Sequence, residues 1–137
     1  MAIIRAARKF PGEVLNGFCK ISDEELFRSP TIPKAVVRPD GRLLYMSRAA
    51  IPSTKALSFV KSWRQICIYA FTPEALKAFG AAPGKTPLEQ LEDIEILRFL
   101  ELGFEVRMVP MSDVSIAVDT PEDVERVAAA LRQMALT

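Results

Sequence analysis

The sequence contains no histidine among its 137 residues. Histidine is the usual general base of enzymes, a common zinc ligand and the central residue of a Ser-His-Asp triad, so none of these chemistries can rest on a histidine of this chain. Any catalysis must instead use carboxylates, lysine, arginine, tyrosine or a metal ion that is bound through oxygen.

Cysteine is scarce, and the two cysteines, Cys19 and Cys67, are far apart with apolar neighbours. The sequence has no CxxC pair, which argues against a thiol-bound metal or a redox motif. We therefore expect two buried, reduced thiols.

Long apolar runs and an excess of charge of one sign are also missing. Lys and Arg number 18 and Asp and Glu number 17, which gives a formal net charge of +1. This balance gives no electrostatic reason to expect a nucleic acid or an acidic membrane surface as a partner. The basic first residues lack the uninterrupted apolar stretch of a secretory signal, and no run approaches the ~18 apolar residues of a membrane span. We expect a cytoplasmic protein.

The glycine-rich loops that hold phosphates are absent as well, since neither GxGxxG nor GxxxxGK[ST] occurs. What the chain does have is an ordinary globular composition, with 50% hydrophobic and 26% charged residues. Its length suits a single domain with a real core.

Three Thr-Pro pairs predict where helices begin, at Thr72, Thr86 and Thr120. In each pair the threonine suits the N-cap position, the proline suits the first helical position, and acidic residues follow in the first turn. The helices predicted from these starts run from residue 73 to Gly80, from residue 87 to Gly103 and over residues 121–134. In the last of them we expect Val124, Val127, Ala128 and Leu131 to point inward. A shorter helix is expected to begin near residue 22 and to end before residue 30. We expect one continuous apolar stripe along the second Thr-Pro helix.

Apolar and β-branched runs between these helices predict strands at residues 13–20, 34–38, 43–47, 65–71, 105–109 and 115–118. Pro39, Asp40 and Gly41 predict a turn, so that the second and third strands form an antiparallel hairpin. Residues 49–62 are the longest expected loop. Because strands and helices alternate in the second half, we expect a layered α/β fold.

Four blocks of sequence together carry a family resemblance. Residues 36–52 read VVRPDGRLLYMSRAAIP, residues 64–71 read RQICIYAF, residues 87–98 read PLEQLEDIEILR, and residues 118–127 read VDTPEDVERV. In the same order they are similar to family motifs that end in Y-F-S-R-A-x-I-P and that read R-H-x-G-I-Y-A-Y, P-L-E-Q-I-E-x-L-E-x-L-R and V-D-T-P-E-D-L-E-R-V. The family is that of the 3-deoxy-manno-octulosonate (Kdo) cytidylyltransferases, or CMP-Kdo synthetases, and related enzymes that activate acidic sugars. The resemblance implies a partial nucleotidyltransferase-like (Rossmann-like) layered α/β fold with a mixed sheet and a protruding β-hairpin.

In such enzymes CTP and a sugar acid give a CMP-sugar and pyrophosphate with the help of Mg²⁺, for lipopolysaccharide or capsule synthesis. The N-terminal half of the family carries an A-R-x-x-S-x-R-L-P-G-K loop and a Q-G-D-E-P segment, and this sequence has neither. The resemblance therefore implies that residues 1–137 form one domain, the C-terminal sugar-binding and dimerising portion, which is inactive by itself. Its expected partner is a second copy or a separate N-terminal half. The alternative is a standalone, non-catalytic module that homodimerises or binds a sugar acid.

The resemblance also implies the site residues. Asp119 corresponds to a Mg²⁺ ligand, although it could instead only help to cap the helix that follows. Glu89 and Gln90 correspond to residues at a helix N-terminus that face the hydroxyls of the sugar. Tyr69 corresponds to a tyrosine beside the sugar pocket, with a place in the core as the alternative. Arg48 leaves the hairpin where it could meet a carboxylate or a partner subunit.

Two departures from the family fall in the strand that resembles the sugar-binding strand. Gln65 stands where the family has histidine, and Cys67 stands where it has glycine. Gln65 is kept as a candidate sugar-binding residue, but the identity of the sugar is open: an amino-Kdo or a nonulosonic acid fits as well as Kdo. For Glu92, Glu95 and Arg98 we expect a solvated, salt-bridged helix face.

Overall fold

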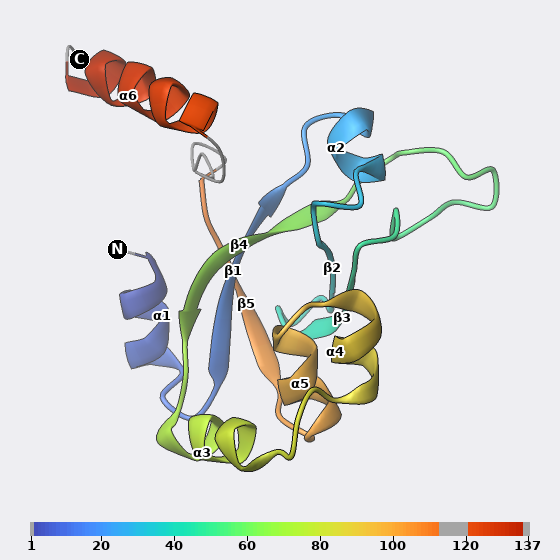
Figure 1. Cartoon of the computed structure of the whole chain (residues 1–137), viewed down its shortest axis with the longest axis vertical. Helices are drawn as coiled ribbons and strands as arrows, with labels where there is room; N and C mark the ends of the chain where they lie inside the picture. Colours follow the sequence, from blue (N-terminus) through green and yellow to red (C-terminus); the bar gives the residue numbers. More distant parts are fainter. Residues whose placement is uncertain (1, 113–120, 136–137) are drawn as a thin grey trace.

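The structure is a computed structural model that describes residues 2–112 and 121–135. The described residues form one five-stranded sheet in the order β3-β2-β4-β1-β5. The strands are β1 (Val14–Lys20), β2 (Lys34–Val37), β3 (Leu43–Ser47), β4 (Trp63–Ala70) and β5 (Val106–Pro110). The helices are α1 (Ala2–Lys9), α2 (Glu24–Arg28), α3 (Pro73–Ala81), α4 (Pro87–Glu92), α5 (Ile96–Glu101) and α6 (Pro121–Ala135). Figure 1 shows their arrangement.

The sheet is mixed, because β1 and β5 are parallel while the other neighbouring strands are antiparallel. This confirms the expected α/β fold with a mixed sheet. The predicted strand at residues 115–118 lies outside the described residues, and so does Asp119.

The predicted hairpin is confirmed as β2 and β3. The amide of Gly41 donates to the carbonyl of Arg38 at 2.9 Å, and Gly41 has a φ of 92°, a conformation that only glycine adopts readily. The turn also reaches the far edge of the sheet, where the amide of Met108 donates to the carbonyl of Gly41 at 2.8 Å.

Two hydrophobic clusters occupy the two faces of the sheet, and the alternation of side chains along β1 divides them. Leu15 packs with Ile3 of α1 and with Val109, which places α1 on one face. Val14 packs on the other face in a cluster with Leu97 and other residues of α5, of the hairpin and of α3. Figure 1 shows α1 on one side of the strands and α4 and α5 on the other, with α3 below the ends of the strands.

The single helix expected after Thr86 is wrong, because the chain breaks it into α4 and α5. Asp93 adopts the left-handed conformation with a φ of 52° and ends α4. Arg48 explains the break: its Nε donates to the carbonyl of Glu92 at 2.5 Å and its Nη2 to the carbonyl of Asp93 at 2.9 Å. A continuous helix would have used these carbonyls for its own amide groups. The apolar stripe is therefore interrupted, and Leu91 is 81% exposed while Ile94 is buried.

Three further expectations concern the cysteines, the last helix and membrane-spanning segments. Cys19 is buried, but Cys67 is exposed, so the expectation of two buried thiols is wrong for Cys67. The last predicted helix is present as α6, although Val124 and Leu131, expected to point inward, are 55% and 60% exposed. Within the described ranges, no helix has the length and apolar character needed to cross a membrane.

Candidate functional site

An irregularity in β4 shapes the candidate site. Asn16 lies opposite Tyr69, but the next residue, Gly17, lies opposite Ile66, so β4 contributes two more residues than β1 does at this point. Such a bulge turns the side chains of the longer strand in new directions. A Cβ atom on Gly17 would lie 2.6 Å from Cγ2 of Ile68, so this close approach of the two strands requires glycine.

The side chain of Asn16 fills the irregularity and links it to the face of β4. Asn16 is fully buried, and its Nδ2 donates to the carbonyls of Ile66 and Ile68 at 3.0 and 3.1 Å. Nε2 of Gln65 donates to Oδ1 of Asn16 at 3.0 Å and to the hydroxyl of Tyr69 at 3.2 Å. The structure thus brings together two of the predicted site residues, Gln65 and Tyr69, and adds Asn16 as their buried partner. We call these three residues the β4 site.

Tyr69 is a protonated phenol at neutral pH. Burial raises the pKa of Tyr69, and a hydrogen bond with the Cys67 side chain and the charge of Glu95 raise it further. Its ring stacks on Phe71 with centroids 5.5 Å apart, and Phe71 in turn stacks on Phe99 at 5.1 Å. The ring of Tyr69 therefore packs on the aromatic cluster, while its hydroxyl lies among polar side chains. A place beside a sugar pocket stays a prediction.

Glu89 lies in a buried ion pair at the start of α4. Its side chain is 1% exposed and accepts two hydrogen bonds from Arg98, from Nε at 2.6 Å and from Nη2 at 2.8 Å. The amide of Thr86 donates to the same carboxylate at 3.1 Å, as a capping box requires. Burial alone would raise the pKa of Glu89, but the hydrogen bonds from Arg98 and Thr86 outweigh it and hold the pKa below 4.5. Gln90 is exposed on the same helix.

A second enclosed carboxylate, that of Glu92, lies where α4 meets the hairpin. It accepts from the hydroxyls of Ser47 at 2.6 Å and Tyr45 at 3.2 Å, and from the amide of Arg48 at 2.9 Å. Burial opposes ionisation, but these donors and the Arg48 charge keep the pKa of Glu92 below its usual value. The expected solvated face is therefore wrong for Glu92, and also for Arg98, whose side chain is 13% exposed.

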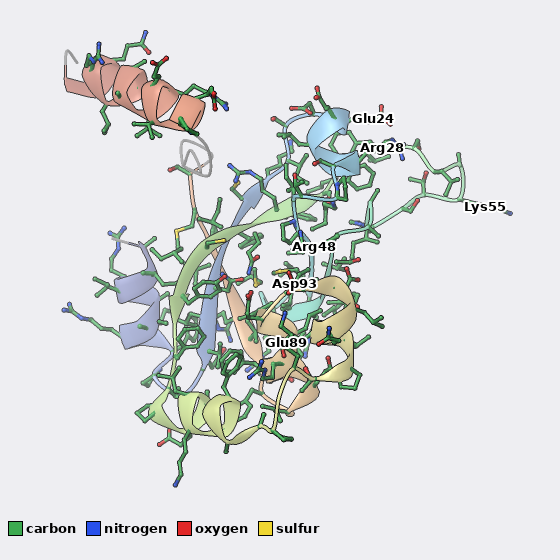
Figure 2. All side chains as sticks on the ribbon, viewed as in Figure 1. Glu24, Arg28, Arg48, Lys55, Glu89 and Asp93 are labelled. Atoms are coloured by element: carbon green, nitrogen blue, oxygen red, sulfur yellow. The ribbon has the colours of Figure 1, made fainter. Side chains whose placement is uncertain are left out.

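Arg48 is used within the chain itself. Besides its bonds to the carbonyls after α4, its Nη1 donates to the carbonyl of Pro30 at 3.1 Å. Its own carbonyl accepts from Nζ of Lys34 at 2.6 Å, and Lys34 also donates to the carbonyl of Ser29 at 2.7 Å. Lys34 is fully buried, and this burial, together with the charge of Arg48, lowers its pKa. Figure 2 shows Arg48 and Asp93 near one another and Glu89 farther along.

We call the set of Lys34, Ser47, Arg48 and Glu92 the hairpin junction. Among the described residues, Arg48 makes no hydrogen bond to the β4 site. Sequence reasoning did not single out Asn16 or the junction. The signal for Asn16 was present, because an amide inside the apolar run VLNGF needs a buried partner.

Mg²⁺ binds carboxylate oxygens, and the described residues do not offer it a suitable group. Among them there is no cluster of three or more His, Cys, Asp or Glu side chains able to hold a metal ion. The carboxylates of Glu89 and Glu92 already accept hydrogen bonds from the chain. Asp119, the predicted ligand, lies outside the described residues.

Comparison with known proteins relates this geometry to a family. No protein-family model matches the sequence. The chain is 40% identical over 115 residues to the 3-deoxy-manno-octulosonate cytidylyltransferase of Syntrophotalea carbinolica, covering 77% of this chain and 46% of that protein. It is 35% identical over 119 residues to the same enzyme of Protochlamydia amoebophila, covering 85% of this chain and 46% of that protein.

A solved structure agrees with these relatives. It is that of a CMP:2-keto-3-deoxy-manno-octonic acid synthetase complexed with CTP, and it matches with a TM-score of 0.85 at 28% identity. The match covers 96% of this chain and 54% of that one. Fold and comparisons together show that the chain is homologous to part of a class of CTP-dependent nucleotidyltransferases. More narrowly, the chain is homologous to the C-terminal part of the 3-deoxy-manno-octulosonate cytidylyltransferases, and it spans about half the length of the curated relatives it matches.

Proposed function

We propose that this chain is the sugar-acid-binding portion of a cytidylyltransferase that activates Kdo or a related acidic sugar to its CMP-sugar, for lipopolysaccharide or capsule synthesis. The observation that carries the proposal is the β4 site, which lies in the block that resembles the sugar-binding strand of the family. There an amide and a phenol, Gln65 and Tyr69, are joined by a hydrogen bond on the same strand. Neutral hydrogen-bonding groups next to aromatic rings suit a polyhydroxylated ligand.

In this proposal the chain binds and orients the sugar, and another portion supplies the nucleotide site. The anomeric hydroxyl of the sugar attacks the α-phosphate of CTP, a step that depends on positioning and on neutralisation of charge. Mg²⁺ would supply that neutralisation, held by Asp119 and by an aspartate of the kind that the family carries in its N-terminal half. The isolated chain should therefore form no CMP-sugar.

The open side of β4 is where we place the N-terminal portion. β2 pairs with β4 only at Arg64 and Trp63, and the amide of Gln65 donates to the carbonyl of Pro33. Beyond Gln65, no further backbone pairing to the described residues occurs on this side of β4. An unpaired strand edge is a template for another strand. The opposite edge of the sheet is already partly covered by the turn at Gly41.

The test is to supply the N-terminal portion of a relative, such as the Syntrophotalea carbinolica enzyme, to the purified chain. CMP-sugar formation from CTP and Kdo should require both parts. In hydrogen exchange, those amides of Ile66 to Ala70 that point away from β1 should gain protection on mixing, while those of β3 serve as an internal control and should not change. Product formation by the 137-residue chain alone would contradict the division of labour.

A second candidate function is a standalone module that dimerises or binds a sugar acid without catalysis. It is favoured by the loop before β4, where Leu57 and Val60 are 69% and 73% exposed and available to a second copy. Sedimentation analysis at micromolar concentration distinguishes the candidates. A dimer that does not bind the N-terminal portion favours the standalone module. A well-folded, strictly monomeric chain that binds the N-terminal portion excludes the standalone module.

A further inference from the structure

We propose that Asn16 fixes the orientation of the Gln65 amide so that Gln65 offers a ligand only its carbonyl oxygen, and that the bound sugar acid places a hydroxyl or protonated amine against it. Asn16 is thus a positioning residue, and Gln65 determines specificity. The choice of a sugar acid as the ligand rests on the proposed function, whereas the orientation of the two amides does not.

The first step is the orientation of Asn16. Its terminal amide faces two backbone carbonyls, those of Ile66 and Ile68. A carbonyl can only accept a hydrogen bond, so the atom that faces both must be the donor Nδ2. Both protons of Nδ2 are then used, and Oδ1 must point the other way. Because the side chain is fully buried, turning it over would leave two carbonyls and an amide without partners.

The second step is the orientation of the Gln65 amide, which follows from that of Asn16. Oδ1 of Asn16 can only accept, so the Gln65 atom 3.0 Å from it must be the donor Nε2. The same Nε2 lies 3.2 Å from the hydroxyl of Tyr69, which takes its second proton. Both donors of Gln65 are therefore used within the protein. Its Oε1 receives no donor from the described residues and is left as a free acceptor.

The third step is chemical. A histidine, which the family has at this position, can donate or accept with its ring nitrogens, but the held glutamine can only accept. A ligand carboxylate placed against Oε1 would meet acceptor with acceptor and be disfavoured. A hydroxyl would be bound, and a protonated amine more strongly, because charge-assisted hydrogen bonds are the stronger ones. The carboxylate of the sugar acid must accordingly lie elsewhere.

The orientation is tested on the wild-type chain without ligand, by NMR of its side-chain amides. The two Nε2 protons of Gln65 should exchange with solvent at least tenfold more slowly than those of Gln90, an exposed glutamine on α4 that serves as the control. In Asn16→Ala they should become faster by a similar factor. Equal exchange of Gln65 and Gln90 in the wild-type chain would overturn the proposal, and this holds even if Asn16→Ala fails to fold.

The ligand half is tested by calorimetric titration with Kdo and with its 8-amino-8-deoxy analogue. Gln65→Met, similar in size but without the acceptor, should weaken binding about tenfold, whereas Gln133→Met should leave it unchanged. Binding by Gln65→Met within twofold of the wild type would overturn the specificity role. If the wild-type chain binds neither sugar acid while its Gln65 amide is protected, the proposed function falls together with the ligand assignment, and the fixed orientation stands.

Discussion

Two regions of the molecule hold polar side chains inside the fold, and they differ in whether their hydrogen-bonding groups are used up. In the hairpin junction, Glu92 accepts from three donors, Arg48 donates to three carbonyls, and Lys34 donates to two. In the β4 site, Gln65 donates twice but keeps an acceptor without a donor from the described residues. The hydrogen-bonding groups of the hairpin junction are used within the chain, whereas the β4 site keeps one acceptor that a ligand could use.

The difference follows from what burial costs. A buried polar group without a partner costs about 1–3 kcal/mol, more for a charge, so charged groups are kept inside only where partners from the chain surround them. A neutral amide can be left half-satisfied at lower cost. Predicted site residues that carry charge, such as Arg48 and Glu89, accordingly have hydrogen-bond partners within the chain, whereas Gln65 keeps an acceptor for the ligand that we propose.

The largest expected effect is on the hairpin junction. Glu92→Ala removes the acceptor of three donors and a negative charge that favours the charged form of the buried Lys34, so it should lower the free energy of unfolding by about 3 kcal/mol in urea titrations. Glu24→Ala is the control, because Glu24 pairs with Arg28 on the surface of α2 (Figure 2) and should cost less than about 0.5 kcal/mol. Similar losses in both variants would contradict the junction's role.

The break between α4 and α5 gives the next largest effect. Ile94→Ala should cost about 3 kcal/mol, because Ile94 is 2% exposed in the main core cluster. Leu91→Ala should cost less than about 0.5 kcal/mol, because this leucine points to solvent. An unbroken amphipathic helix would make both losses large, so thermal or urea unfolding of the pair decides between the two descriptions.

A smaller effect is the dependence of stability on pH. The pKa values of Glu89 and Glu92 are held below 4.5 in the folded chain, so their ionised forms stabilise it above that pH. This stability should be lost as the pH falls through their folded-state pKa values. In Glu89→Gln the free energy of unfolding should be lower at pH 7 and should decline less between pH 5 and 3. A parallel decline in wild type and variant would show that Glu89 does not contribute.

The smallest effect on stability is expected in the β4 site. Tyr69→Phe keeps the ring stack and removes one neutral partner of Gln65, so it should cost about 1 kcal/mol or less. Tyr45→Phe, which removes a donor to the Glu92 carboxylate, should cost more, because hydrogen bonds to charged groups are worth about 1.5–3 kcal/mol. For sugar binding the order should reverse. Calorimetric titration with Kdo that finds no change in Tyr69→Phe would remove Tyr69 from the site.

Features set by neighbours in the sequence were predictable. The hairpin turn follows from Gly41, and the start of α3 follows from Thr72, whose hydroxyl accepts from the amide of Ala75 at 3.1 Å. The break at Asp93 was not, because its cause is Arg48, a residue far away in the sequence that takes the carbonyls of the helix end. Hydrophobic periodicity indicates which secondary structure a segment favours. It does not indicate which distant side chain will bind the backbone carbonyls of that segment.

Prediction of the candidate site from the sequence was limited in the same way, because contacts between distant residues were not predictable. The family resemblance placed Gln65 and Tyr69 on one strand, and the structure adds the bond between them. The partner of Glu89 is nine positions away at Arg98, a pairing that no single straight helix would allow. The role of Asn16 depends on a bulge in another strand, which the spacing of apolar residues does not reveal.

The two residues that β4 adds at that bulge are Cys67 and Ile68, and the two cysteines of the chain differ in their exposure to solvent. Cys19 is enclosed, while Cys67 lies exposed beside the hydroxyl of Tyr69. Under native conditions a maleimide or iodoacetamide reagent should therefore label one thiol rapidly and the other only on unfolding. A fluorophore attached there would report directly on occupancy of the neighbouring site, without any engineered residue.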